Sequence, residues 1–148
     1  MMKKITCALL AAALLLVGTA CHKKSEQQAP FRADDVAQAL LTSGAFSETL
    51  EELDLDIALM MFWLDGDMSQ YEGSRVYCST GATAETLAVI CVADPNLVSQ
   101  VEQALKAWVD SQVEAEMDYR PTEVPKLMNA TLVSRGNSVL LADRKSVV

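Results

Sequence analysis

Residues 74–117 read SRVYCSTGATAETLAVICVADPNLVSQVEQALKAWVDSQVEAEM, and they hold two strand patterns followed by one long helix pattern. The strands are predicted at Ser74–Ser79 and Thr86–Val92, because both runs are rich in β-branched and aromatic residues. The loop between them, TGATAE, contains glycine and small residues that suit a hairpin. This stretch therefore predicts an antiparallel strand pair beside a helix that must cover it.

The helix pattern begins at Asp94 and Pro95, which suit the cap and first-turn positions of a helix. Apolar residues then recur every three or four positions, opposite a charged face. The apolar positions are Leu97, Val101, Leu105, Trp108, Val109, Val113 and Met117, and the charged positions are Glu102, Lys106, Asp110 and Glu114. This spacing predicts an amphipathic helix that is the longest element of the chain.

Shorter elements are predicted on both sides of this stretch. Before it we expect a helix at Phe31–Leu41, a strand at Ala45–Leu53, and a helix capped by Asp56 that runs through Leu64 and ends at Asp65 and Gly66. After it we expect a helical turn at 122–129, and strands at Ala130–Val133 and Ser138–Leu141 around a turn of Arg135, Gly136 and Asn137. The order predicts an α+β fold, with a single mostly antiparallel sheet of four or five strands packed against the long helix and the shorter helices.

The first twenty residues, MMKKITCALLAAALLLVGTA, have the form of a signal peptide, with two lysines, an apolar run and small residues at the end. The strongly apolar part, about a dozen residues, is shorter than the ~20 that a membrane-spanning helix needs. The sequence thus predicts a signal peptide at 1–20, a lipid-attachment cysteine with a flexible tether at 21–30, and one globular domain at 31–148.

Cys21 directly follows the small residues, in the position where bacterial lipoproteins receive a diacylglycerol thioether. Gly18 stands where such sites usually have leucine, so plain secretion after ordinary cleavage is the alternative. The polar residues 22–30 favour a tether, which spans roughly 15 to 18 Å as a coil and at most about 30 Å when stretched. We expect a lipoprotein that carries acyl chains such as palmitate and is anchored at the extracytoplasmic face of the cell membrane.

The charge of the chain restricts its partners. It has 12 Lys and Arg against 20 Asp and Glu, a formal net charge of −8, and the signal peptide holds two of the lysines and no acid. Nucleic acid is excluded as a partner, because its binding depends on basic side chains that release counterions from phosphates. The predicted partners are the membrane, through the lipid anchor, and a membrane or cell-wall protein within reach of the tether.

The sequence predicts no catalytic residue, metal or cofactor. His22 is the only histidine and lies outside the domain, so Ser-His and Cys-His pairs lack a base and zinc sites lack their usual ligand. Carboxylates cluster at 51–56 and 65–67 without the spacing of a calcium loop, as a solvated acidic face would. Carboxylates can still pair in space, which leaves a carboxylate-based cell-wall hydrolase as an alternative.

Cys78 and Cys91 would form a disulfide in many exported proteins. In a hairpin centred near Ala82 and Thr83, Cys78 faces Leu87 and Cys91 faces Ser74. This register separates the two cysteines by about 13 Å along the ladder, whereas a disulfide needs less than about 7 Å between the Cα atoms. We therefore expect two reduced, buried thiols.

Two regions are candidates for binding. The hairpin loop carries Ser79, Thr80, Gly81 and Thr83, whose hydroxyls and amides could cradle an anion, although hairpin loops have this composition for local reasons too. The run from 57 to 64 is apolar on all sides when drawn as a helix, which usually means burial. If Met60, Met61 or Trp63 lies outward instead, it contributes to a partner surface.

Three stretches, YCSTGATAETLAVICV, DPNLVSQVEQALKAWVDSQ and YRPTEVPKLMNATLVSRGNSVLL, resemble the bacterial lipoprotein domain-of-unknown-function family 4358. The resemblance runs from about Leu50 to Leu141, and its more specific parts are 81–85 and the positions Tyr119, Pro121, Val124, Asn129 and Gly136. It implies a small surface-anchored domain of Gram-positive anaerobes, in which free thiols are plausible. It implies no catalytic residues, since none are assigned in the family.

Together these features predict a membrane-anchored extracytoplasmic lipoprotein with a non-enzymatic binding or accessory domain. The alternatives are the carboxylate-based hydrolase and a homo-oligomeric structural module.

Overall fold

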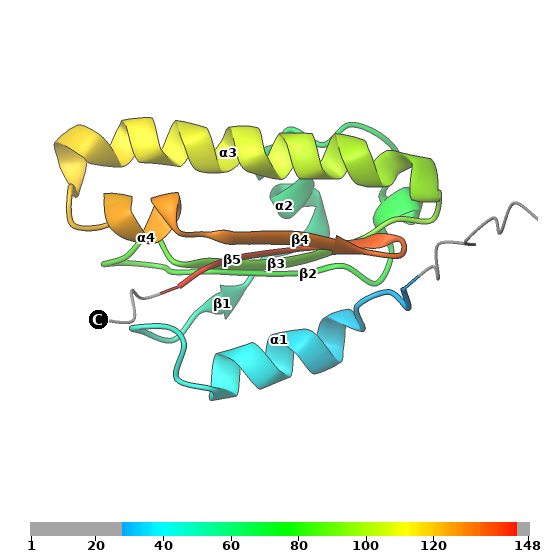
Figure 1. Ribbon diagram of the computed structural model, residues 1–148, viewed down its shortest axis with the longest axis horizontal. Helices are drawn as coiled ribbons and strands as arrows, with labels where there is room; N and C mark the ends of the chain where they lie inside the picture. Colours follow the sequence, from blue (N-terminus) through cyan, green and yellow to red (C-terminus); the bar gives the residue numbers. More distant parts are fainter. Residues whose placement is uncertain (1–27, 145–148) are drawn as a thin grey trace, which may run out of the picture.

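A computed structural model describes residues 28–144 (Figure 1). The predicted signal peptide, Cys21 and most of the predicted tether lie outside the described residues. The helices are α1 (Ala33–Thr42), α2 (Leu55–Met61), α3 (Val98–Tyr119) and α4 (Val124–Met128), with short 3-10 turns η1 (Met68–Tyr71) and η2 (Pro95–Leu97). The strands are β1 (Glu51–Glu52), β2 (Arg75–Cys78), β3 (Thr86–Cys91), β4 (Thr131–Arg135) and β5 (Ser138–Asp143).

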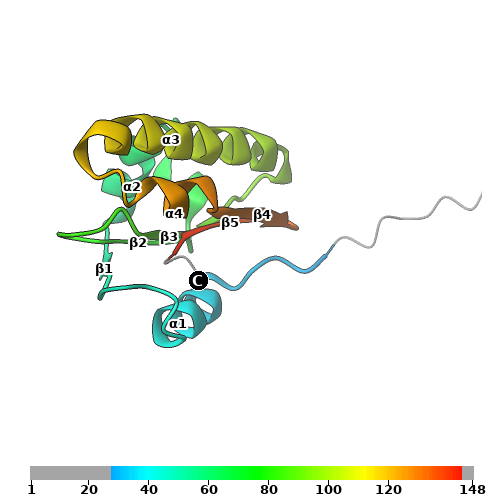
Figure 2. The ribbon, with the colours of Figure 1, turned by 60° about the vertical axis from the view of Figure 1, so that its left-hand side comes forward.

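The five strands form one sheet in the order β1-β2-β3-β5-β4, and every neighbouring pair is antiparallel. Helix α1 covers one face of the sheet, while α2, α3 and α4 lie on the other (Figures 1 and 2). The predicted α+β class, the antiparallel sheet and the long covering helix are therefore confirmed. No helix within residues 28–144 is long and apolar enough to cross a membrane.

The main core lies between the sheet and the α2/α3 layer. Val101, Leu105 and Trp108 on α3 are buried there, as their helical spacing predicts. Phe62, at the end of α2, meets the Trp108 ring edge to face with ring centroids 5.1 Å apart. Val139 and Leu141 on β5 meet this core, so alternate residues of the strand face α3.

A smaller core lies between the sheet and α1. It contains Ala37 of α1, Leu50, Leu87 of β3 and Ala142 of β5, all buried, with Leu140 packed beside them. The segment just before α1 is attached to the sheet, because the Phe31 amide donates a hydrogen bond to the Ser138 hydroxyl, 2.7 Å away. The chain therefore enters the domain on the α1 face of the sheet.

The β2–β3 hairpin forms as predicted but with its register displaced by one residue. Cys78 lies opposite Thr86 rather than Leu87, and Arg75 lies opposite Val89. Since side chains alternate, Cys78 faces α3 while Cys91, which lies opposite Ser138, faces α1. Both cysteines are free thiols, half-buried rather than buried, and burial raises the pKa of each.

Helix α2 differs from the prediction at both ends. It begins after Asp54, two residues before the predicted cap at Asp56, which lies inside the first turn. It ends at Met61, with Phe62 as its C-cap, rather than at Asp65 and Gly66. The Trp63 amide donates to the Met60 carbonyl (3.2 Å) and the Leu64 amide donates to the Leu59 carbonyl (2.9 Å), the two bonds of a Schellman turn.

Two other predictions are wrong in part. Only Glu51 and Glu52 of the predicted strand at Ala45–Leu53 pair with β2, because the Ser47 amide donates instead to the Glu85 carboxylate. Near the end of α3, Met117 is 61% exposed although it was predicted to face the core. Glu116 is buried in its place, because it receives hydrogen bonds from Arg120 one turn later.

Candidate functional site

The hairpin loop before β3 holds a carboxylate, and that carboxylate belongs to the chain itself. The Ser79 hydroxyl, the Thr83 hydroxyl (2.7 Å) and the Thr83 amide (3.1 Å) all donate to Glu48. The hydrogen bonds from Ser79 and then Thr83 lower the pKa of Glu48. Thr80 and Gly81 are exposed at the tip of the loop, and the Gly81 carbonyl accepts a hydrogen bond from Arg120. Two of the four residues predicted to bind an outside anion, Ser79 and Thr83, thus already bind Glu48, while Thr80 and Gly81 do not.

A second group of charges is enclosed just behind this loop. Glu85 and Asp143 are fully buried, and Glu123 is nearly so. Lys126 lies 3.0 Å from Glu123 and 3.4 Å from Glu85. Ser47 donates its amide and its hydroxyl to Glu85, each at 2.7 Å. We call Glu85, Glu123, Asp143 and Lys126 the carboxylate cluster.

Asp143 is the member of the carboxylate cluster whose negative charge is least compensated. Neither of its carboxylate oxygens has a hydrogen-bond partner among the described residues. Burial, with the negative charge of Glu85 beside it, raises the pKa of Asp143 to about 7. Burial alone would lower the pKa of Lys126, but its hydrogen bond to Glu123 and the charge of Glu85 raise it overall. One lysine thus faces three carboxylates, which favours a protonated Asp143.

The sequence contains the members of this cluster but no signal that would bring them together. Glu85 directly precedes β3, Glu123 and Lys126 lie at the N-cap and inside α4, and Asp143 ends β5. They meet only because Thr86 and Asp143 are partners across the sheet. Within residues 28–144, no three His, Cys, Asp or Glu side chains are grouped so that they could hold a metal ion. The carboxylate cluster therefore links α4, the 79–85 loop and the end of the sheet.

The predicted partner residues on α2 divide between the surface and the interior. Met60 is 69% exposed and Trp63 is 57% exposed, whereas Met61 packs against the main core. Ile57 and Met68, which the sequence reading missed, are also about half exposed. The i, i+3 spacing of Ile57, Met60 and Trp63 could have revealed a shared face. We call Ile57, Met60 and Trp63, which lie on α2 and its C-terminal turn, the α2 patch.

Trp63 occupies an unfavourable backbone conformation. Its φ is 55°, the left-handed region, and it is the only non-glycine residue in the described part of the chain with a positive φ. This position of a Schellman turn usually belongs to glycine, because a side chain there costs about 1 kcal/mol. The buried contact of Leu59 and Leu64 on either side of the turn stabilises it. The fold thus tolerates local strain that presents an aromatic side chain to solvent.

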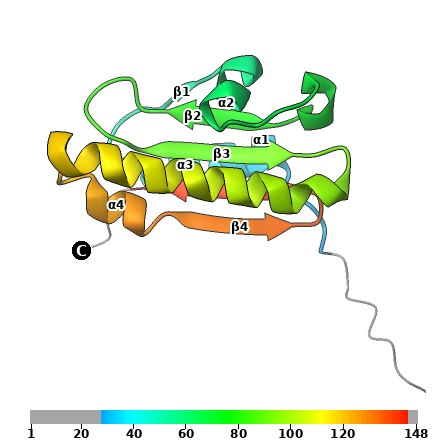
Figure 3. The same cartoon turned by 90° about the horizontal axis from the view of Figure 1, so that it is seen from above.

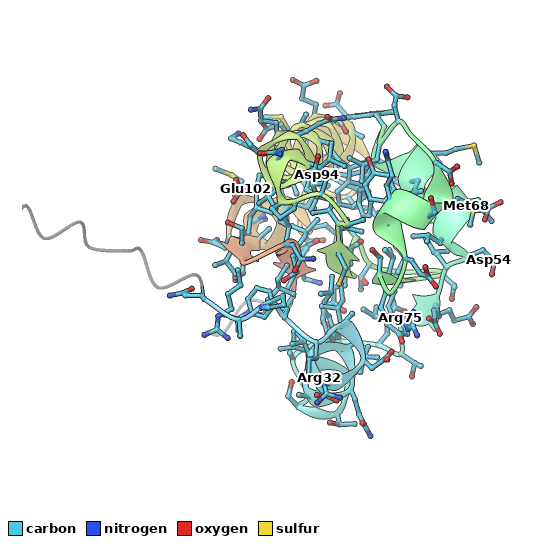
Figure 4. All side chains as sticks on the ribbon, turned by 90° about the vertical axis from the view of Figure 1, so that its right-hand side faces the viewer. Arg32, Asp54, Met68, Arg75, Asp94 and Glu102 are labelled. Atoms are coloured by element: carbon cyan, nitrogen blue, oxygen red, sulfur yellow. The ribbon has the colours of Figure 1, made fainter. Side chains whose placement is uncertain are left out.

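An acidic groove of about 660 Å³ lies at the N-terminal end of α2, where Asp54, Leu55 and Met68 are among its lining residues. Figure 4 shows Asp54, Met68 and Arg75 gathered on one side of the domain. Arg75 is already paired, 2.8 Å from Asp34 and 3.5 Å from Glu52. The remaining charged residues that line the groove are Asp54 and Glu72. The candidate site is therefore an apolar patch next to a negatively charged groove.

The pKa of Asp143 predicts how stability depends on pH. The folded state keeps a proton that the unfolded state loses near its ordinary pKa of 3.8, so stability falls as pH rises from about 4 to about 7. At ~1.4 kcal/mol per pH unit, the loss reaches at most about 4 kcal/mol. We expect Asp143→Asn to remove this loss, so that urea unfolding shows the variant gaining on the wild type between pH 5 and pH 8.

The control for removing one negative charge is Asp118→Asn, because Asp118 is exposed on α3. An equal gain in both variants over this pH range would contradict the assignment to Asp143.

Comparison with known proteins gives one match. The family model of a domain of unknown function, DUF4358, matches residues 46–143, which include the 79–85 loop, the carboxylate cluster and the α2 patch. No curated protein and no solved structure matches the chain. The match spans well over half of the chain and every described element except α1, so the chain belongs to the DUF4358 family.

Proposed function

We propose that this protein is a membrane-anchored extracytoplasmic lipoprotein whose domain binds another protein and catalyses no reaction. The anchor is a lipid on Cys21, exposed as the first residue after the signal peptide is cleaved. The sequence of residues 1–30 supports the anchor. The α2 patch supports the binding role.

The observation that carries the binding role is Trp63. Exposed tryptophans are enriched among the residues that dominate protein interfaces. Here the side chain stays 57% exposed on a backbone that glycine would fit better. Strained residues of this kind cluster at functional sites, where a surrounding structure holds them in place. Met60 and Ile57 on the same face add adaptable apolar area around it.

The chemistry of the site indicates the chemistry of the partner. Apolar side chains of a partner would cover Met60 and Trp63, which are 69% and 57% exposed in the free domain. The adjacent groove, with Asp54 and Glu72 unpaired by Arg75, favours lysine or arginine beside those apolar groups. A like-charged partner would be repelled there, so the groove adds specificity more than affinity.

The geometry of the fold also suits a tethered binding domain. The chain enters on the α1 face through Phe31, whereas α2 lies on the opposite face of the sheet (Figure 2). A lipid anchor on the α1 side would leave the α2 patch pointing away from the bilayer. With a tether of at most about 30 Å, the partner would be a membrane protein or a wall component close to the surface.

A carboxylate-based cell-wall hydrolase remains the rival proposal, because the acidic groove holds Glu52, Asp54 and Glu72. In that mechanism two carboxylates flank the scissile bond and one acts as a general acid. Release of wall fragments by the purified protein, abolished in Glu72→Gln, would favour it over binding.

The binding proposal predicts that Trp63→Gly weakens partner binding while leaving the stability of the domain nearly unchanged. The free energy of unfolding should change by less than about 1 kcal/mol, because relief of the left-handed strain offsets the lost contacts of a half-exposed side chain. A photo-crosslinking amino acid at Met60 should give one discrete adduct in native membranes, and Trp63→Gly should weaken that adduct at least tenfold. Urea unfolding and immunoblotting measure the two effects.

Tyr119 provides a matched control, since it is 79% exposed at the far end of α3. The same crosslinker at Tyr119 should not give this adduct. An adduct unchanged by Trp63→Gly, or one formed equally from Tyr119, would contradict the α2 patch as the binding surface.

The anchor predicts incorporation of a clickable fatty acid into the full chain expressed in bacteria. Cys21→Ala should abolish the label, because the thiol that forms the thioether is gone, while Cys78→Ala should retain it. Equal labelling of wild type and Cys21→Ala would exclude the anchor and leave plain secretion.

A further inference from the structure

The two edges of the sheet are built differently. At one edge, β1 has only two residues, Glu51 and Glu52, and both side chains are exposed. Short, charged strands of this kind keep other strands from pairing. At the other edge, β4 has five residues and its only charge is Arg135 at the end. In Figure 3, β4 lies along the rim of the sheet, and among residues 28–144 it pairs with β5 alone.

The backbone groups that β4 leaves unpaired can be identified. The Val92 amide donates to the Asn137 carbonyl (2.9 Å). Because backbone groups along a strand alternate in direction, every second residue of β5 counted from Asn137 bonds β3 through its backbone, and the residues between them bond β4. Val133 lies opposite Leu140 and therefore bonds β5. Leu132 and Ser134 direct their amides and carbonyls to the open edge. This edge offers two donors and two acceptors to another strand.

We propose that two copies of this chain pair through β4, antiparallel and centred on Val133, to form one continuous sheet. In this register Leu132 of each copy lies opposite Ser134 of the other, which joins all the unpaired groups in hydrogen bonds. The two Val133 side chains meet on the axis, where β-branched residues favour strand pairing. Thr131 of each copy then lies opposite Arg135 of the other, so no like charges face each other.

A second copy fits this edge because β4 is its own complement in this register. Val133 is 40% exposed and is the middle residue of the strand, so the pairing covers it in both copies. A groove of about 550 Å³ between α3, α4 and β4 opens beside the same edge. Its lining is mainly apolar and includes Val109, Val113 and Leu132. Pairing brings the two grooves together across the axis and removes apolar surface from water.

The proposed pairing also suits an anchored protein, and this one point rests on the proposed function. The twofold axis of an antiparallel strand pair stands normal to the sheet, so both α1 layers stay on one side. The two roots at Phe31 then face the same way, and both lipids can enter one membrane.

The test is cysteine crosslinking of the full chain in the membranes of cells that express it. Val133→Cys should form a covalent dimer on mild oxidation, because facing residues without mutual hydrogen bonds have Cα atoms about 4.5 Å apart. Thr131→Cys should not, since the two copies of residue 131 lie about 13 Å apart along the ladder. The wild type, with Cys78 and Cys91 half-buried, is the blank.

Two further variants control for misfolding and separate strand pairing from the proposed partner binding. Val133→Lys places two positive charges on the axis and should halve the sedimenting mass of the detergent-solubilised protein without changing its circular dichroism. Trp63→Gly should leave the Val133→Cys crosslink intact even if partner binding fails. The proposal is overturned if Val133→Cys gives no dimer, if Thr131→Cys crosslinks equally well, or if Val133→Lys keeps the wild-type mass.

Discussion

The central strands β3 and β5 are buried on both faces, and the arrangement of the domain follows from covering them. From Thr86 to Ile90 every residue of β3 is buried, so a helix is needed on each side of the sheet. Helix α3, with α2, covers one side and α1 covers the other. Each fully buried Val, Leu, Ile or Phe contributes about 1.5–3 kcal/mol, which makes this double cover the main source of stability. It also divides the domain into an α1 face, where the chain enters, and an α2 face, where apolar side chains are exposed.

Several carboxylates of this acidic chain accept hydrogen bonds within the fold. Glu48 accepts hydrogen bonds from Ser79 and Thr83 of the 79–85 loop, and Glu85 accepts the amide and the hydroxyl of Ser47, so carboxylates of the same chain fix two loops. Asp143 is the exception, because it is buried beside Glu85 without a hydrogen-bond partner among residues 28–144. The bonds to Glu48 hold Ser79 and Thr83 in place. Within residues 28–144, by contrast, the side chains of the α2 patch form no hydrogen bond and stay about half exposed or more, which is why the binding role is proposed there.

Periodicity predicted those parts of the fold that depend on nearby residues. The β2–β3 hairpin, α3 and α4 follow from alternation and helical spacing. Asp94 does accept the Asn96 amide, but it caps the 3-10 turn η2 rather than α3, which begins at Val98. The hairpin register was one residue off, because composition identifies a loop more easily than its centre. The C-terminal end of α2 was predicted wrongly, because Trp63 occupies the left-handed position after the C-cap, where a glycine normally signals that a helix ends. The carboxylate cluster was missed because its members meet only through the Thr86–Asp143 pairing.

The division into two faces is tested most directly by energy transfer from tryptophan to a dansyl-labelled lipid, with the full lipid-bearing chain in vesicles. Trp108→Phe leaves Trp63 as the only donor, since the chain has two tryptophans. Gln38→Trp, combined with Trp63→Gly and Trp108→Phe, places the donor on the exposed side of α1. We predict stronger transfer from position 38 than from Trp63, because α1 lies on the side of the tether. Equal or stronger transfer from Trp63 would contradict this account and indicate that the α2 patch rests on the bilayer.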